Sequence, residues 1–214
     1  MNQIKESATY KAAMKRCYET PQNTPHHIYD VGHHIEVVVS HIPKEYADDI
    51  TITAAMLHDI GKPDVRETKP DGTDRFIGHA KRSAEIAEEI LDETGICRDK
   101  KTILWIIKHH EIGDVMRPKT IRRMLNEMGL SNILRLFVVR YADIMGQSDY
   151  ERSEKLNTII ANLDILSMVL KEEDKSDMTV LVLKTYIKKE EEKERHERLT
   201  QRNGLLQKGH EQDL

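Results

Sequence analysis

The chain has 214 residues, which is enough for one medium-sized domain with its own core and a tail. Aromatic residues make up only 5% and charged residues 33%, a composition that argues against an all-β sandwich and favours a soluble, helical protein. A net charge of -4 gives no reason to expect a nucleic-acid coat or an anionic membrane as a partner.

The two cysteines, Cys17 and Cys97, are isolated, and no CxxC spacing indicates a disulfide framework or a zinc site. We interpret them as free thiols in a reducing cytosol. Residues 1–20 lack the apolar segment of a signal peptide. No run approaches the roughly 20 apolar residues that span a bilayer. We therefore expect a cytoplasmic location and no membrane partner.

Helical periodicity divides the chain into three parts. Residues 1–24 form an N-terminal helical extension, residues 25–170 form the main domain, and residues 171–214 form a charged segment that is helical or disordered. Within the last part, 178–187 fits a helix or a strand, and 188–214 fits a solvated helix, a partner-binding arm or a disordered tail. In the main domain, apolar residues recur at helical spacing over 27–42, 50–60, 79–93, 98–110, 117–128, 131–145 and 148–171.

Two of these helices, 50–60 and 131–145, are apolar nearly all round, so we expect them to be buried. Residues 64–78 contain a Pro-Asp-Gly turn and are predicted to form a loop of about fifteen residues. Loops of that length are often lids or binding loops. The pattern as a whole predicts an all-α bundle.

An ionisable pair, His58 and Asp59, ends the apolar sequence ITAAML in the 50–60 helix. Burying an unpaired carboxylate costs several kcal/mol, and the usual remedies are a partner or a metal ion. The pair therefore predicts a metal site between the central helices. The alternative is a His-Asp hydrogen bond without a metal.

Periodicity also distinguishes two neighbouring histidines in the 28–42 segment. At about 100° per residue, its apolar face is centred near Val31 and Ile35. His34 lies at the edge of that face, whereas His33 points away, so His34 is the candidate ligand. Asp30, one turn before His34, would orient the imidazole or join the site itself.

Three further side chains are candidates for the same site. In the 98–110 helix, His110 shares a face with three isoleucines, whereas His109 lies on a different side. We favour His110 as the ligand and leave His109 open as an additional one. His79 begins a helix directly after the long loop, and Asp143 places a carboxylate at the end of the second all-apolar helix.

Neutral imidazoles with carboxylates suit one or two divalent ions of Mn, Fe, Co, Ni or Zn, with Mg as a further candidate. Two ions would be bridged by a carboxylate and a hydroxide. Three cations are candidates for binding a phosphate group and neutralising its charge, although each also has an ordinary role as a helix-end or paired residue: Lys62, Arg82 and Arg140. A basic stretch is either a solvated face or the mouth of an anionic site: Arg117, Lys119, Arg122 and Arg123.

Four segments resemble the HD superfamily of metal-dependent phosphohydrolases: TPHHIYDVGHH at 24–34, AAMLHDIGKP at 54–63, DGTDRFIGHAKRSAEIA at 71–87 and RYADIMGQS at 140–148. The resemblance covers about residues 24–165 and is strongest to the HD domain of bacterial tRNA nucleotidyltransferases, although the chain has no nucleotidyltransferase head. The HDIGK and HHE sequences also resemble HD-GYP phosphodiesterases, but the GYP part is missing. The resemblance implies a four-residue signature of His34, His58, Asp59 and Asp143, with the further histidines of two-metal members at His79 and His110, with His109.

The expected activity is hydrolysis of a phosphoester of a nucleotide or nucleotide-like substrate, as a phosphomonoesterase or a cyclic phosphodiesterase. A metal-bound hydroxide would attack phosphorus, Asp59 would bridge the ions, and Lys62 and Arg82 would stabilise the phosphoryl charge. Two alternatives are a di-iron oxygenase of the same superfamily and a non-catalytic nucleotide-binding module that regulates a partner. A nucleic-acid end as the substrate and an oligomeric assembly stay open.

Overall fold

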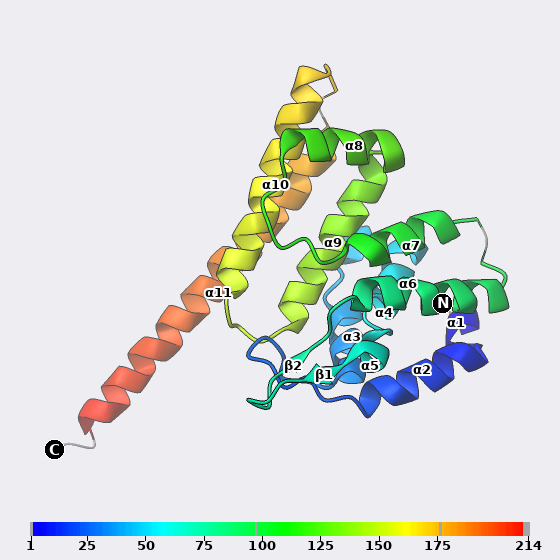
Figure 1. Ribbon diagram of the computed structural model, residues 1–214. Helices are drawn as coiled ribbons and strands as arrows, with labels where there is room; N and C mark the ends of the chain where they lie inside the picture. The colour runs from blue at the N-terminus through cyan, green and yellow to red at the C-terminus, as the bar shows by residue number, and fades with distance from the viewer. Residues whose placement is uncertain (1, 97, 176, 212–214) are drawn as a thin grey trace.

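The computed structural model describes residues 2–96, 98–175 and 177–211, so Cys97 lies outside the described residues. The regular secondary structure of the described residues is helical apart from one short hairpin, which confirms the all-α prediction (Figure 1). Its elements are α1 (Asn2–Glu6), α2 (Ala8–Tyr18), α3 (Val31–Ser40), η1 (Lys44–Tyr46), α4 (Asp49–Leu57), α5 (Lys62–Val65), β1 (Glu67–Thr68), β2 (Asp74–Arg75), α6 (His79–Glu93), α7 (Lys100–His109), α8 (Pro118–Met128), α9 (Leu130–Gly146), α10 (Arg152–Glu172) and α11 (Met178–Glu211). The boundaries drawn at residues 24 and 170 stay predictions.

Helix α4 lies at the centre of the fold and packs against α3, α6, α7 and α9. All residues from Thr51 to Leu57 are buried, as its apolar sequence predicts. Asp48 caps the helix, and its carboxylate accepts a hydrogen bond from the backbone N–H of Thr51 at 2.8 Å. The helix ends at Leu57 rather than at residue 60, so the His58-Asp59 pair lies in the turn between α4 and α5.

The helix predicted over 27–42 begins later than the spacing of apolar residues indicates. Asp30 caps α3, because its carboxylate accepts a hydrogen bond from the backbone N–H of His33 at 2.8 Å. Residues 19–30 instead form an irregular segment, and Ile28, one of the apolar residues at helical spacing in the predicted helix, is 66% exposed. The helical spacing of apolar residues in this segment is coincidental.

Two glycines bring α6 against the turn that follows α4. A Cβ on Gly61 would lie 2.4 Å from the backbone nitrogen of Ser83, so only glycine permits this approach of the two segments. Gly78 has a φ of +82°, a left-handed conformation that glycine adopts at little cost, and it directly precedes α6. The two glycines together place His79, the first residue of α6, near Asp59.

The segment predicted as a long loop, 64–78, is instead a short helix followed by an antiparallel hairpin in which Glu67 pairs with Arg75. The buried Asp74 fixes the hairpin to the rest of the fold. Its carboxylate accepts hydrogen bonds from the backbone N–H of Asn23 at 2.9 Å and from Arg66 at 3.0 Å. The hairpin is therefore anchored to the 19–30 segment.

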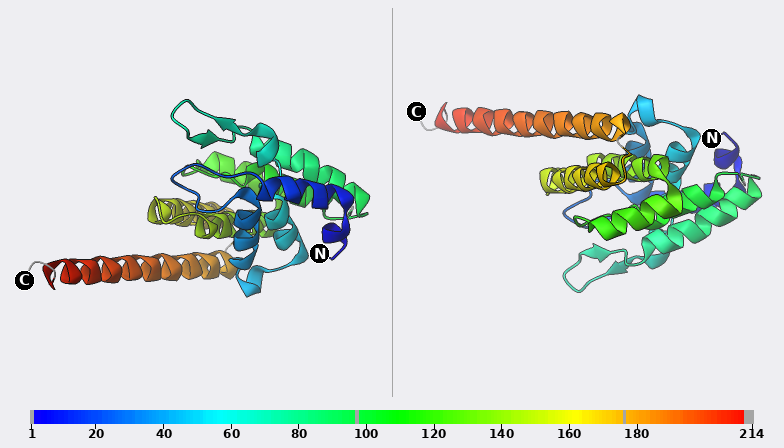
Figure 2. Two further views of the ribbon diagram at one scale, coloured as in Figure 1. Left: turned by 90° about the horizontal axis from the view of Figure 1, so that it is seen from below. Right: turned by 90° about the horizontal axis from the view of Figure 1, so that it is seen from above.

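The segment that fitted a helix or a strand, 178–187, is the first part of the long helix α11. Val180, Leu183 and Ile187 are buried at helical spacing, and α11 packs mainly on α10. Figure 2 shows the later part of α11 extending beyond the rest of the molecule. Among the described residues, no helix combines the length and the apolar character needed to cross a membrane.

Candidate metal centre

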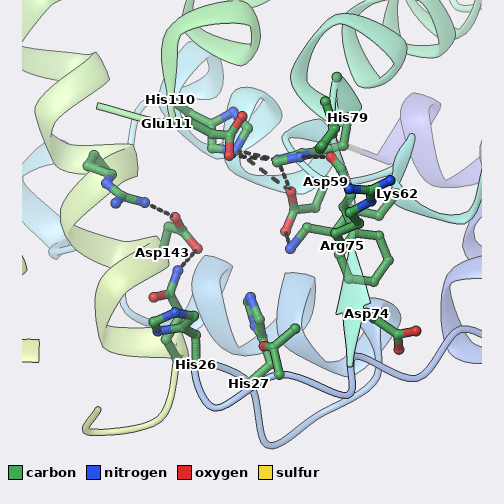
Figure 3. Close-up of a pocket in the computed structure, with 16 residues that line it drawn as sticks. His26, His27, Asp59, Lys62, Asp74, Arg75, His79, His110, Glu111 and Asp143 are labelled. Carbon is green, nitrogen blue, oxygen red and sulfur yellow. Dashed lines mark hydrogen bonds and ion pairs between the residues drawn. The ribbon is translucent and has the colours of Figure 1, made fainter. Parts of the chain in front are cut away.

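Six buried side chains from five parts of the fold converge at the end of α4. They form two groups that share Asp59, and within each group the potential ligand atoms lie within 4.8 Å of one another. Figure 3 shows Asp59, His79 and His110 on one side of a cavity and Asp143 across from them. The first group is His34, His58, Asp59 and Asp143, and the second is Asp59, His79 and His110.

The two carboxylate oxygens of Asp59 face different groups. Its Oδ2 lies 3.4 Å from Nε2 of His34 and 3.2 Å from Nε2 of His58. Its Oδ1 lies 3.1 Å from Nε2 of His79 and 3.7 Å from Nε2 of His110. A carboxylate in this position can bridge two cations, one held by each group.

The four histidines present the same nitrogen to the centre. In each, Nδ1 faces a backbone carbonyl oxygen, which can only accept, so Nδ1 carries the proton and Nε2 offers a lone pair. The bonds run from His34 to Gly146 (3.3 Å), His58 to Ala55 (2.8 Å), His79 to Phe76 (2.8 Å) and His110 to Ile107 (2.7 Å).

This arrangement needs a cation among the lone pairs. Nε2 of His79 lies 3.3 Å from Nε2 of His110, so two acceptors face each other. Among the described residues, Nε2 of His58 and Oδ1 of Asp59 are buried without a hydrogen-bond partner. Protons or metal ions would satisfy these atoms, and a set of imidazole nitrogens and carboxylate oxygens fits divalent transition metals.

Neighbouring groups favour the ionised form of the two carboxylates. Burial opposes the charge on Asp59, but His58 and Lys62 hold its pKa well below its usual range. Burial likewise opposes the charge on Asp143, and His34 and Arg140 lower its pKa well below the ordinary value. Both aspartates therefore stay ionised in the interior, ready to ligate a cation.

Two of the three predicted cations line the cavity, and both are paired with these carboxylates. Nζ of Lys62 lies 2.7 Å from Oδ2 of Asp59, and this side chain is 6% exposed. Arg140 takes the alternative of pairing with a carboxylate, since its Nη1 lies 2.6 Å from Oδ2 of Asp143. Arg82, which was expected to bind a phosphoryl group, is not among the described residues that line the cavity. Its Nε instead lies 2.7 Å from Oδ2 of Asp64.

The structure separates the neighbouring histidines of α3. His34 is fully buried in the first group, whereas His33 is exposed. Asp30 does not orient His34 as expected, because its Oδ2 lies 2.6 Å from Nδ1 of His33. The carbonyl oxygen of Gly146 holds the His34 ring instead.

The two histidines at the end of α7 also separate. His110 belongs to the second group, whereas His109 is exposed and outside both groups of described residues. Its ring lies 4.7 Å from that of Trp105, and its Nδ1 bonds to the Trp105 carbonyl oxygen. The basic stretch 117–123 does not line the cavity either, and Arg122 pairs with Glu172.

A cavity of about 440 Å³ opens beside the second group. This volume falls within the range of small-molecule sites. The sequence analysis did not single out several polar residues that line it: Thr24, His26, His27, Arg75, Glu111 and Gln147. The available signal was a pair of adjacent histidines in a proline-containing segment just before the ligand helix.

Comparison with known proteins identifies the family. A model of the HD domain matches residues 26–202, most of the chain. The chain belongs to the HD domain family. Over 120 residues, 53% of this chain, the HD protein is also 28% identical to the multifunctional CCA protein of Methylobacillus flagellatus. The chain spans about a quarter (28%) of that relative's length. No solved structure matches the chain.

Proposed function

We propose that this HD domain is a metal-dependent phosphohydrolase that cleaves a phosphoester of a nucleotide or nucleotide-like substrate. The observation that carries the proposal is Asp59, whose two oxygens face two separate groups of imidazole nitrogens. Two divalent ions at that spacing would supply Lewis acids and an activated water for attack on a phosphoryl group. The 440 Å³ cavity lies beside them.

The chain's own residues divide the remaining tasks. The backbone carbonyls behind the four histidines fix the imidazoles so that Nε2 faces the centre. Lys62 pairs with Asp59, and its Nζ lies 5.4 Å from the ring centroid of Phe76; both Lys62 and Phe76 line the cavity. Its ammonium is the cation that we assign to stabilising the phosphoryl oxygens.

Metal analysis and hydrolysis tests address the proposal directly. Purified protein should contain up to two equivalents of a divalent transition metal and should hydrolyse at least one of four probes: nucleotides, 2′,3′-cyclic nucleotides, dinucleoside polyphosphates and aryl phosphates. His58→Ala and Asp59→Ala should lose metal and hydrolysis together. His33→Ala, which removes an exposed histidine one residue from a proposed ligand, should change neither.

Four results would count against the proposal. One is no hydrolysis of any probe by metal-loaded protein, and a second is unchanged activity in the His58 and Asp59 variants. The third is consumption of oxygen without release of phosphate by iron-loaded protein, which would favour the di-iron oxygenase. Nucleotide binding without turnover would favour the non-catalytic module.

A further inference from the structure

Within the described part of the chain, two buried polar atoms of the segment between α2 and α3 have no hydrogen-bond partner. Oγ1 of Thr24 and Nδ1 of His27 are buried and make no hydrogen bond with the described residues. Both residues line the cavity beside the metal centre. Buried polar atoms in folded proteins are nearly always satisfied by protein, water or ligand, so these two atoms are candidates for ligand contacts.

The segment is held firmly in place on both sides. The backbone N–H of His27 donates to the carbonyl oxygen of Thr24 at 3.3 Å, which places the two residues on one turn. The carbonyl oxygen of His26 accepts from the N–H of Ser148 at 2.8 Å. On the other side, Asn23 exchanges hydrogen bonds with the buried Asp74 of the hairpin. Thr24 and His27 are therefore presented on a fixed backbone.

The position of His27 ties this turn to the metal centre. Its ring packs edge-to-face on His34, a member of the first group, with 4.8 Å between the ring centroids. Nδ1 of His34 faces a carbonyl oxygen, whereas Nδ1 of His27 has no acceptor among the residues that the structure describes. In Figure 3, His27 points into the cavity from below, facing Asp59 and Lys62. A group bound by His27 would lie beside the reacting phosphoryl group.

The hydrogen-bonding capacity of the two side chains indicates what that group is. The cations that line the cavity are paired with carboxylates, Lys62 with Asp59, Arg140 with Asp143 and Arg75 with Glu67, so the ions of the proposed metal centre would be the main attraction for an anionic phosphoryl group. A threonine hydroxyl and a neutral imidazole each offer one donor and at least one acceptor, the complement of an alcohol, which also donates and accepts. A phosphate dianion offers acceptors only.

We propose that Thr24 and His27 form a subsite for an uncharged hydroxyl of the substrate, next to the phosphoryl group, such as a ribose hydroxyl. The subsite rests on the proposed phosphohydrolase function and adds selection for a polyhydroxylated alcohol. Sites built to bind a hydroxyl discriminate strongly against analogues that lack it, because their polar groups then stay unpaired.

Matched nucleotide pairs test the subsite. The probes are 5′-AMP with its 2′-deoxy and 3′-deoxy forms, 3′-AMP with its 2′-deoxy form, and p-nitrophenyl phosphate, which has no hydroxyl. For whichever pair is turned over, kcat/KM of the wild type should favour the hydroxylated member by about tenfold or more. Thr24→Val and His27→Phe should remove that preference. Thr24→Ser should keep it, and hydrolysis of p-nitrophenyl phosphate and metal content should change less than about twofold in the variants.

Calorimetric binding of the same pairs, with and without Mn²⁺, separates the subsite from the hydrolase proposal. A hydroxyl preference in binding that the two variants lose, without any turnover, supports the subsite and contradicts the phosphohydrolase. Hydrolysis with no hydroxyl preference supports the phosphohydrolase and overturns the subsite. The subsite is also overturned if the variants keep the preference, if they lose metal or aryl phosphate hydrolysis in parallel, or if no nucleotide binds.

Discussion

The ion pair between Lys62 and Asp59 permits a quantitative test of how the centre is stabilised. Their charged atoms lie 2.7 Å apart, and the side chains are 6% and 2% exposed. At an effective dielectric constant of about 20, two unit charges at this distance attract by about 6 kcal/mol. Removing one partner of such a buried pair costs about 3–5 kcal/mol, because the other charge stays buried without compensation.

Asp59→Asn in metal-free protein should therefore lower the free energy of unfolding by about 3–5 kcal/mol. Lys62 would keep one strong acceptor, Oε1 of Gln22 at 2.7 Å. For a domain of this size the loss corresponds to roughly 6–20 °C in Tm. Lys62→Met should cost less. Burial opposes a charge on His34, but hydrogen bonds to Asp143 and Asp59 raise its pKa, so a protonated His34 would still face Asp59 in metal-free protein. The double variant should be more stable than the sum of the two changes predicts, with a coupling energy of about 2 kcal/mol.

Urea unfolding in EDTA, followed by circular dichroism, gives the free energy of unfolding of the wild type, the two single variants and the double variant. The exposed pair of Lys11 and Glu6, with nitrogen and oxygen 2.6 Å apart but side chains 56% and 78% exposed, is the matched control. Glu6→Gln should leave the urea midpoint of unfolding nearly unchanged, because solvent screens the pair. Additive effects in the Asp59–Lys62 cycle, or equal losses at the buried and exposed pairs, would refute the reasoning.

Two further predictions concern groups away from the cavity. Glu93 accepts hydrogen bonds from Ser7 and from the first backbone N–H groups of α2, which lower its pKa to about 2 from 4.5. The stabilisation is present above pH 4.5 and is lost as the pH falls towards 2, so the Tm difference between wild type and Glu93→Gln should narrow below pH 4.5. Glu89→Gln, at an exposed position of the same helix, is the control. A Tm difference that stays constant with pH would contradict the stabilising role of ionised Glu93. Burial raises the pKa of the Cys17 thiol to about 12. Iodoacetamide at pH 8 should therefore label Cys17 in urea but not in the native protein, as measured by peptide mass spectrometry. Equal labelling in both conditions would exclude a buried thiol.

The parts of the fold that the sequence predicted best are those in which burial repeats with a helical period. The boundaries of α6 match the prediction at both ends, because its apolar face is regular and the chain enters it through a turn. His34 and His110 were selected over their neighbours for the same reason: each lies with the apolar face of its helix, whereas His33 and His109 lie on a different side. A residue's position on the apolar face of a helix can be predicted from its near neighbours in the sequence.

The parts that the sequence did not predict depend on contacts between distant segments. Arg82 has helical spacing from His79, yet it pairs with Asp64, whose position is set by the turn after α4. Asp30 also matches the pattern of an N-cap, a polar residue directly before an apolar run. This pattern competed with its spacing from His34, and in the structure Asp30 is the N-cap of α3. Thr24 and His27 lie in an irregular segment, where no period distinguishes a cavity-lining side chain from a solvated one.

The pairing of charges in the centre explains how such a buried site can exist before it binds an ion. Each ionised aspartate has its own cation, Lys62 for Asp59 and Arg140 for Asp143, so neither charge is uncompensated in the interior. A phosphoryl group would therefore share Lys62 with Asp59, and Arg140 with Asp143. Under the proposed function, attraction of an anionic substrate therefore depends chiefly on the bound divalent ions, which couples substrate affinity to metal content.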